Sequence, residues 1–156
     1  MGKTSFNATC TFTVAKNNIP AKCEAAISHV ATGTKKATTK ACQDILDISN
    51  SLVPVDTGTL QKSGYFEVTR QANIVSYRYE GVVGYGGNGD PINPKTGKHA
   101  SEYMVQVHED LNQPHPNGGQ AKFLEEEAVQ QYAQQEFPRT VAQYIRDALS
   151  SILGGD

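Results

Sequence analysis

The stretch "PAKCEAAISHVATGTKKATTKACQDILDISNSL", residues 20–52, decides the fold class of this chain. Its apolar residues recur at helical spacing, and Pro20 suits a first turn because the donor it lacks would have no partner there. Small residues along the stretch allow another element to approach closely, and Gly33 is a candidate point of interruption. The pattern predicts one long helix that packs against other elements. Its apolar positions are Cys23, Ile27, Val30, Ala37, Ala41, Ile45, Ile48 and Leu52.

The segments on either side of this helix alternate apolar and polar residues, as half-buried strands do. Residues 5–16, "SFNATCTFTVAK", predict an N-terminal strand. Residues 64–70, "GYFEVTR", and 73–85, "NIVSYRYEGVVGY", predict a hairpin. Residues 103–109, "YMVQVHE", predict a further strand with Tyr103, Val105 and Val107 on one face.

The remaining segments complete an α+β domain. Residues 84–102 are rich in Gly and Pro and predict a long flexible loop. Helical patterns follow around Phe123–Tyr132 and Phe137–Ile152, with Pro138 in the first turn of the second helix. We expect a single domain over residues 1–156, an antiparallel sheet packed by a long N-terminal helix and C-terminal helices. Residues 1–19 form its N-terminal strand and arm, and 153–156 its tail.

Composition narrows the classes of partner. The formal net charge is -2, whereas a domain that gains its affinity by neutralising phosphates needs clustered Lys and Arg. The three cysteines lack C-x-x-C spacing, which favours a reducing compartment over a disulfide framework. No apolar run approaches the length of about 18 residues that a membrane span needs. We therefore expect synthesis in the cytoplasm and no membrane association.

Asp56-Thr57-Gly58 is the triplet of aspartic proteases, in which two carboxylates share one proton. The chain carries one copy of the triplet, so a protease would have to be a homodimer. The alternative is a capped turn, in which Asp56 caps a short helix and Val55 and Leu60 form a hydrophobic staple. We expect the capped turn and no catalytic residues.

Two further patterns resemble ligand sites. Gly84-x-Gly86-x-x-Gly89 has dinucleotide-binding spacing, but "DPINP" follows where that motif requires a helix N-terminus. His99, His108, Glu109 and His115 have the side chains of a zinc site without its fixed spacing on rigid elements. A flexible loop and a chain without a bound cofactor or metal are the expected outcomes, and a metal-binding module is the alternative.

The stretch "VQVHEDLNQPHPNGGQAKFLEEEA", residues 105–128, separates into a strand end, a connection punctuated by Pro and Gly, and a helix start at "KFLEEEA". Its candidate contacts are His108 and Glu109 before the connection and Gln120, Lys122 and Phe123 after it. These residues are expected to fix the connection against the subunit's own sheet or against the next subunit.

Three stretches in order after an N-terminal helix, "PVDTGTLQKSG" (54–64), "YMVQVHE" (103–109) and "GQAKFLEEEA" (119–128), carry a resemblance. Together they resemble the tail-completion or neck proteins of long-tailed bacteriophages, often labelled minor capsid or tail-component proteins. The resemblance covers roughly residues 20 to 152. It implies a non-enzymatic virion protein of the neck, which joins head and tail as a subunit of a ring around the DNA channel.

The implied partners are other copies in the ring, adjacent head-connector and tail proteins, and DNA that passes without sequence-specific contact. Adaptor, stopper, completion and terminator positions in the neck all fit. An N-terminal strand could add to a neighbour's sheet. The interface candidates are Phe6, Phe12, Val55, Asp56, Thr57, Gly58, Leu60, His108, Glu109, Gln120, Lys122 and Phe123.

Overall fold

A computed structural model describes residues 5–13, 21–72, 76–87, 89–115 and 117–153 of the chain. Three strands and six helical segments follow one another in these ranges, which confirms the predicted α+β class. They are β1 (Ser5–Thr13), α1 (Ala21–Leu52), α2 (Thr59–Lys62), β2 (Tyr65–Ala72), β3 (Ser76–Gly84), α3 (Ala100–Glu109), α4 (Glu127–Gln131), the π-helical turn η1 (Tyr132–Glu136) and α5 (Phe137–Leu153).

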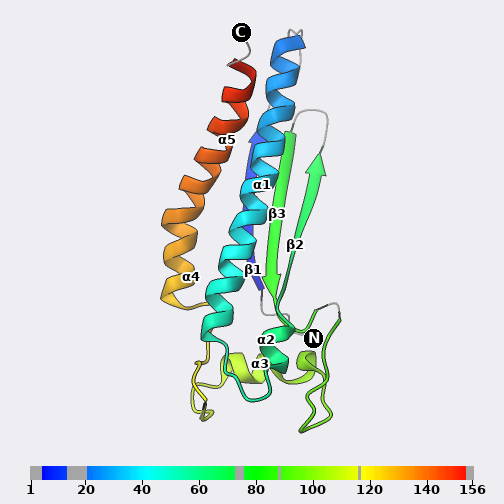
Figure 1. Ribbon diagram of the computed structural model, residues 1–156, viewed down its shortest axis with the longest axis vertical. Coiled ribbons are helices and arrows are strands. Elements are labelled where there is room, and N and C mark those ends of the chain that lie inside the picture. The colour runs from blue at the N-terminus through cyan, green and yellow to red at the C-terminus, as the bar shows by residue number, and fades with distance from the viewer. Residues whose placement is uncertain (1–4, 14–20, 73–75, 88, 116, 154–156) are drawn as a thin grey trace.

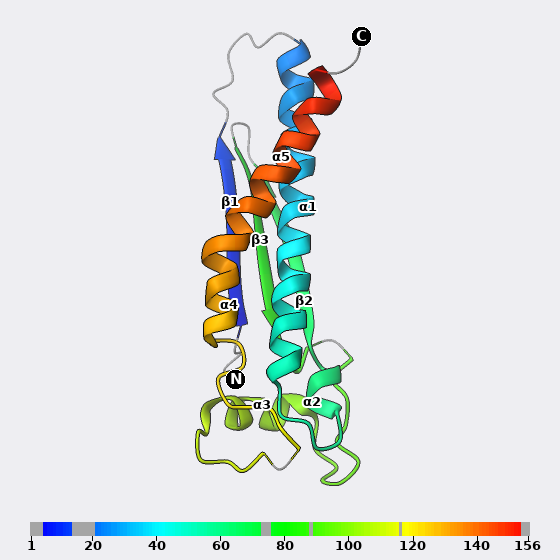
Figure 2. The same cartoon turned by 60° about the vertical axis from the view of Figure 1, so that its left-hand side comes forward.

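The elements are arranged along α1, which at 32 residues is about 48 Å long. The sheet packs along one side of α1 and α5 along another (Figures 1 and 2). Short helices α2 and α3 and most of the loops gather at the C-terminal end of α1, and we call this end the base. The base consists of α2, α3 and the loops 53–58, 85–99 and 110–126. Within the described ranges, no helix is both long and apolar enough to span a membrane.

The sheet has the order β1-β3-β2, and both pairs are antiparallel. The predicted hairpin of β2 and β3 is confirmed, and its turn at residues 73–75 lies outside the described part. Phe66 is paired with Val83, so the two side chains share one face of the sheet. Val83 is fully buried in the core and Phe66 packs against that core. This face therefore meets α1.

The core lies between this face of the sheet, the C-terminal half of α1 and the base. Ala41, Ile45 and Val53 contribute from the end of α1, and Met104 and Phe123 contribute from the base. Buried polar groups require hydrogen-bond partners, and the hydroxyl of the buried Tyr85 has them in the core. The Tyr85 hydroxyl donates to Asn50 Oδ1 at 2.9 Å and lies 3.0 Å from Ser49 Oγ, joining the end of β3 to α1.

Gly33 does not interrupt α1, which is continuous from Ala21 to Leu52. Its role lies in helix packing. A Cβ atom at this position would lie 2.7 Å from the carbonyl oxygen of Tyr144 in α5. Thr34 and Thr38 are buried nearby and donate to carbonyl oxygens of their own helix, at Val30 and at Thr34. Small or self-satisfied side chains therefore let α1 and α5 approach closely.

The strand predicted at residues 103–109 is wrong, because this segment belongs to helix α3. Its buried residues Ala100, Met104 and His108 recur every four residues, the spacing of one helix face. The backbone N–H of His99 donates to Glu102 Oε2 at 2.6 Å, which caps the first turn. The loop predicted over 84–102 therefore ends at His99, and Asn93 N–H to Lys98 O at 2.8 Å closes a turn within it.

The C-terminal helices form one run from Glu127 to Leu153, with η1 inserted before Pro138. The N–H of Phe137 donates to Tyr132 O, five residues earlier. A proline has no N–H and its ring crowds the preceding turn, and a π turn relieves that conflict. The helix start predicted at "KFLEEEA" is wrong: residues 121–126 form turns, and Lys122 has a positive φ of 57° that no helix interior allows.

Candidate functional site

The three stretches that carry the resemblance come together at the base. Gly119 lies so close to Pro54 that a Cβ atom would be 2.5 Å from Pro54 Cα. The N–H of Gln120 donates to Leu52 O at 2.8 Å, and the N–H of Lys122 donates to His108 O at 2.7 Å. Residues 52–54, 108 and 119–122 are thus joined through backbone contacts, although they are far apart in the sequence.

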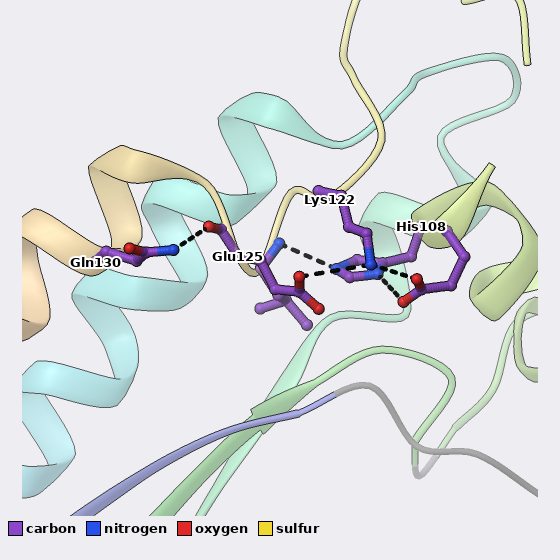
Figure 3. A network of polar contacts seen from close by, with 6 residues as sticks. His108, Lys122, Glu125 and Gln130 are labelled. Atoms are coloured by element: carbon purple, nitrogen blue, oxygen red, sulfur yellow. Dashed lines mark hydrogen bonds and ion pairs between the residues drawn. The ribbon is translucent and has the colours of Figure 1, made fainter. Parts of the chain in front are cut away.

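His108 is the centre of this junction, with only 1% of its surface exposed. Its Nε2 accepts from the N–H of Leu124 at 3.4 Å, and its Nδ1 lies 2.9 Å from Glu109 Oε1 (Figure 3). An imidazole that accepts at Nε2 carries its proton on Nδ1, which then donates to Glu109. The ring also makes an edge-on contact with Phe123 at 4.7 Å between ring centroids, and Phe123 makes a second with Tyr85 at 5.1 Å.

The charged rim of the junction consists of Glu109, Lys122 and Glu125. Lys122 Nζ contacts Glu109 Oε2 and lies 3.5 Å from Glu125 Oε2. The hydrogen bond from Lys122, followed by that from His108, lowers the pKa of Glu109. The same bond raises the pKa of Lys122. Each partner thus favours the charged form of the other.

His108, Glu109 and Glu125 are also the group of possible metal ligands within the described ranges, with ligand atoms within 4.8 Å of one another. The ammonium of Lys122 contacts both of these carboxylates, and both nitrogens of His108 have partners. A cation would have to displace Lys122 and break the bond to Leu124. The arrangement therefore acts as a structural tie between α3 and the 119–126 segment.

The other histidines considered as ligands are placed elsewhere in the base. His99 precedes α3, and its Nδ1 lies 3.1 Å from the carbonyl oxygen of Asp90. His115 lies in the loop between α3 and α4. The four-residue set is not brought together, because His108 and Glu109 are neighbours in α3 and neither loop histidine joins them. Gly84-x-Gly86-x-x-Gly89 likewise lacks its helix: after β3, α3 begins only at Ala100.

Asp56 does not cap a helix, so that prediction is wrong. The N-cap of α2 is Gly58 with φ 73°, two residues later, which moves the staple positions away from Val55 and Leu60. Asp56 forms an ion pair with Lys95 and its side chain is 58% exposed. A protease dyad needs closely paired carboxylates that share one proton, and an exposed carboxylate held by lysine offers the opposite environment.

The segment 54–60 instead forms one wall of a groove of about 500 Å³ in the base. The other walls come from α3, from the 93–98 loop and from the 113–118 loop. Thr57 Oγ1 lies 2.7 Å from Thr59 Oγ1, and the Tyr103 hydroxyl bonds to Asn93 and Thr59. Desolvation is the main cause that raises the pKa of Tyr103. The groove thus combines fixed hydroxyl groups with apolar wall residues such as Val55 and Val107.

The remaining interface candidates differ in their availability to a neighbour. Leu60, His108 and Phe123 are buried within the fold of the chain, so their side chains serve its own core. Gln120 is partly buried and contacts Glu126 through its side chain. Phe6 and Phe12 belong to β1, and their side chains lie outside the described part. Val55, Asp56, Thr57 and Gly58 line the groove.

Sequence patterns missed several residues of the base. Asn93 and Lys98 line the groove from loop 85–99, and Tyr103 lines it from α3, which replaced the predicted strand. Glu125 joins the charged rim through Lys122, three residues earlier, whose Nζ lies 3.5 Å from Glu125 Oε2. The groove contacts of Asn93 and Lys98 come from segments distant in sequence. By contrast, "HASE" carried a local helix signal in Glu102, three residues after His99.

The chain was compared with known families, proteins and structures. The sequence matches no protein-family model, and no curated protein or solved structure is significantly similar to it. The resemblance to phage neck proteins therefore rests on the three sequence stretches alone.

Proposed function

We propose that this chain is a structural protein of the phage neck, which joins head and tail as a subunit of a ring around the DNA channel. The observation that carries the proposal is the meeting of all three motif stretches in the base. Residues 54–64, 103–109 and 119–128 pack as one unit, through contacts such as Gly119 against Pro54 and Leu124 N–H to His108 Nε2. Three stretches that resemble the same family, in the same order along the chain, are expected to pack together as one structural unit.

The chemistry of the base also supports an assembly role over a catalytic one. The histidine with the best placement for acid–base work, His108, is buried and hydrogen-bonded on both sides. The carboxylate of the protease-like triplet is exposed and paired with Lys95. Both groups stabilise connections between segments. Loops held in this way form a defined surface for a neighbouring protein.

The charge of the chain fits a channel through which DNA slides. A formal net charge of -2 gives no strong attraction to phosphates. Such a subunit leaves passing DNA free to move, whereas a basic ring would hold it. The DNA is therefore a passing partner, and the stable partners are other copies and the adjacent head and tail rings.

Native mass spectrometry tests this proposal with the purified full chain, alone and mixed with head-connector and tail proteins of the same phage. We expect a closed homo-oligomer or a stoichiometric complex with one of these rings. Negative-stain images of the same sample should contain annular particles. A chain that stays monomeric at all concentrations and binds none of these proteins contradicts the proposal.

A further inference from the structure

The groove in the base has the size and lining of a docking site. Its volume of about 500 Å³ falls within the range of roughly 300–1,000 Å³ that is typical of ligand sites. Val55, Pro114 and Val107 supply apolar wall, and Lys98 stands among the lining residues as an exposed cation. Its fixed hydroxyl groups come from Thr57, Thr59 and Tyr103. An occupant with an apolar side chain and an adjacent carboxylate matches this lining.

The chain itself presents a segment with this chemistry. Among the described residues, four large apolar side chains are exposed: Val55 at 36%, Val105 at 37%, Ile92 at 55% and Leu111 at 74%. Leu111 is the most exposed and lies outside the groove, in the turn that follows α3. Asp110 directly precedes it, and Asp110 Oδ1 accepts from the N–H of Asn112 at 2.9 Å, which shapes the turn.

We propose that the groove of one subunit receives the Asp110–Leu111 turn of a second copy of this chain. Leu111 packs against Val55 and Val107, and Asp110 faces Lys98 across the contact. Charge complementarity selects this occupant. Asp56 also lines the groove but is paired with Lys95, so Lys98 is the cation of the lining that meets the Asp110 carboxylate of the turn. The proposal rests on the proposed function, to which it adds the contact between neighbouring subunits.

The groove and the turn consist of different residues, although the groove wall resumes at Gln113, two residues after Leu111. In a head-to-tail contact, each pair of neighbouring subunits uses one groove and one turn. A contact of this kind leaves one free groove and one free turn at the ends of any open chain, and it closes into a ring when the rotation allows. When copies are joined through their bases, the contact does not involve the ends of α1 and α5 that lie far from the base. A ring built in this way therefore leaves those ends free.

The test compares self-association of the full chain with that of Leu111→Ser and Val55→Ser, by analytical ultracentrifugation over a concentration series. Each variant should raise the dissociation constant at least tenfold, because each removes apolar contact from one side. Ile92→Ser is the matched control, since it changes an exposed apolar residue of the base outside the groove, and it should change the constant less than threefold. Thermal unfolding must show that all variants fold.

A charge exchange identifies the partners. Lys98→Glu and Asp110→Lys should each weaken association tenfold or more, and the double variant should return it to within threefold of the wild type. The proposal is overturned by a wild-type chain that stays monomeric, by equal loss in Ile92→Ser, or by a double variant without recovery. It is also overturned if the groove variants weaken binding to another neck protein alone.

The outcomes separate this proposal from the proposed function. A ring that persists in Leu111→Ser and Val55→Ser overturns the docking contact and keeps the neck role. A dimer that both variants dissociate supports the docking contact and contradicts the ring.

Discussion

The two ring nitrogens of His108 have different partners, and this difference fixes its tautomer. Nε2 accepts from a backbone N–H, and Nδ1 donates to a carboxylate whose pKa is lowered. The ring fills space beside Phe123 at the same time. Histidine is often used for catalysis or metal binding. Here His108 instead joins α3 to the 119–126 segment, by packing and by hydrogen bonds.

The first prediction concerns removal of this ring. His108→Ala should lower the free energy of unfolding by about 3 kcal/mol, because it leaves a cavity and an unpaired N–H at Leu124. Urea unfolding followed by circular dichroism measures the change. His115→Ala is the matched control, with an expected effect below about 0.5 kcal/mol. Equal effects of the two substitutions contradict the structural role of His108.

The second prediction concerns pH and Glu109. Its pKa is lowered in the folded chain from an ordinary value of 4.5, so it contributes stability above that pH. The contribution is lost as pH falls through the lower folded value. Wild type should therefore be more stable than Glu109→Gln at pH 7, and the difference should disappear in acid. An NMR titration that places the Glu109 pKa at or above 4.5 contradicts this prediction.

At the scale of elements, the contact between α1 and α5 depends on one missing side chain. The helices approach at Gly33, where the neighbours of an added Cβ would be Tyr144 O at 2.7 Å and Ala148 Cβ at 3.2 Å. The backbone of Tyr144 cannot move away without shifting α5. Glycine is therefore required by packing, against its low intrinsic helix propensity.

The third prediction follows from this contact. Gly33→Ala should lower the free energy of unfolding by about 1–3 kcal/mol, because overpacking exceeds the gain in helix propensity. Thr32→Ala, at the exposed neighbouring position, is the control and should change it by less than about 0.5 kcal/mol. Calorimetric or urea unfolding measures both. A stabilised Gly33→Ala contradicts the close approach of the two helices.

Helix α3 shows why alternation alone misassigned an element. Tyr103, Val105 and Val107 alternate as a strand does, yet Val105 is exposed while Met104 and His108 are buried. Short segments fit both periods, and the choice then depends on which residues the rest of the chain can bury. Here α2 and the 119–126 segment cover the helical face. The cap from Glu102 was the local signal for a helix.

At the scale of the whole molecule, burial is uneven along α1. Residues 37–46 contain the fully buried Ala37, Thr38, Ala41, Cys42 and Ile45. Residues 23–30 are exposed or partly buried. Burial also raises the pKa of Cys42 to about 11, which leaves its thiol protonated and unreactive at neutral pH. The most stable region therefore lies where the sheet and α1 meet.

The fourth prediction concerns local stability. Hydrogen exchange should be slowest for the amides of residues 37–46 and at least tenfold faster for residues 23–30, because protection follows buried contacts. Mass spectrometry of peptides from the exchanged full chain measures both regions of one helix. Equal protection of the two regions contradicts this distribution of stability.

The sequence by itself determined the α+β class, the long helix, the hairpin and the helical nature of the C-terminal segment. These features follow from apolar spacing over many residues, which local physics fixes. Only the tertiary structure decided that His108 is internal, that Asp56 pairs with Lys95, and that loops distant in sequence enclose a groove. Each of these outcomes depends on contacts between segments that no local pattern encodes.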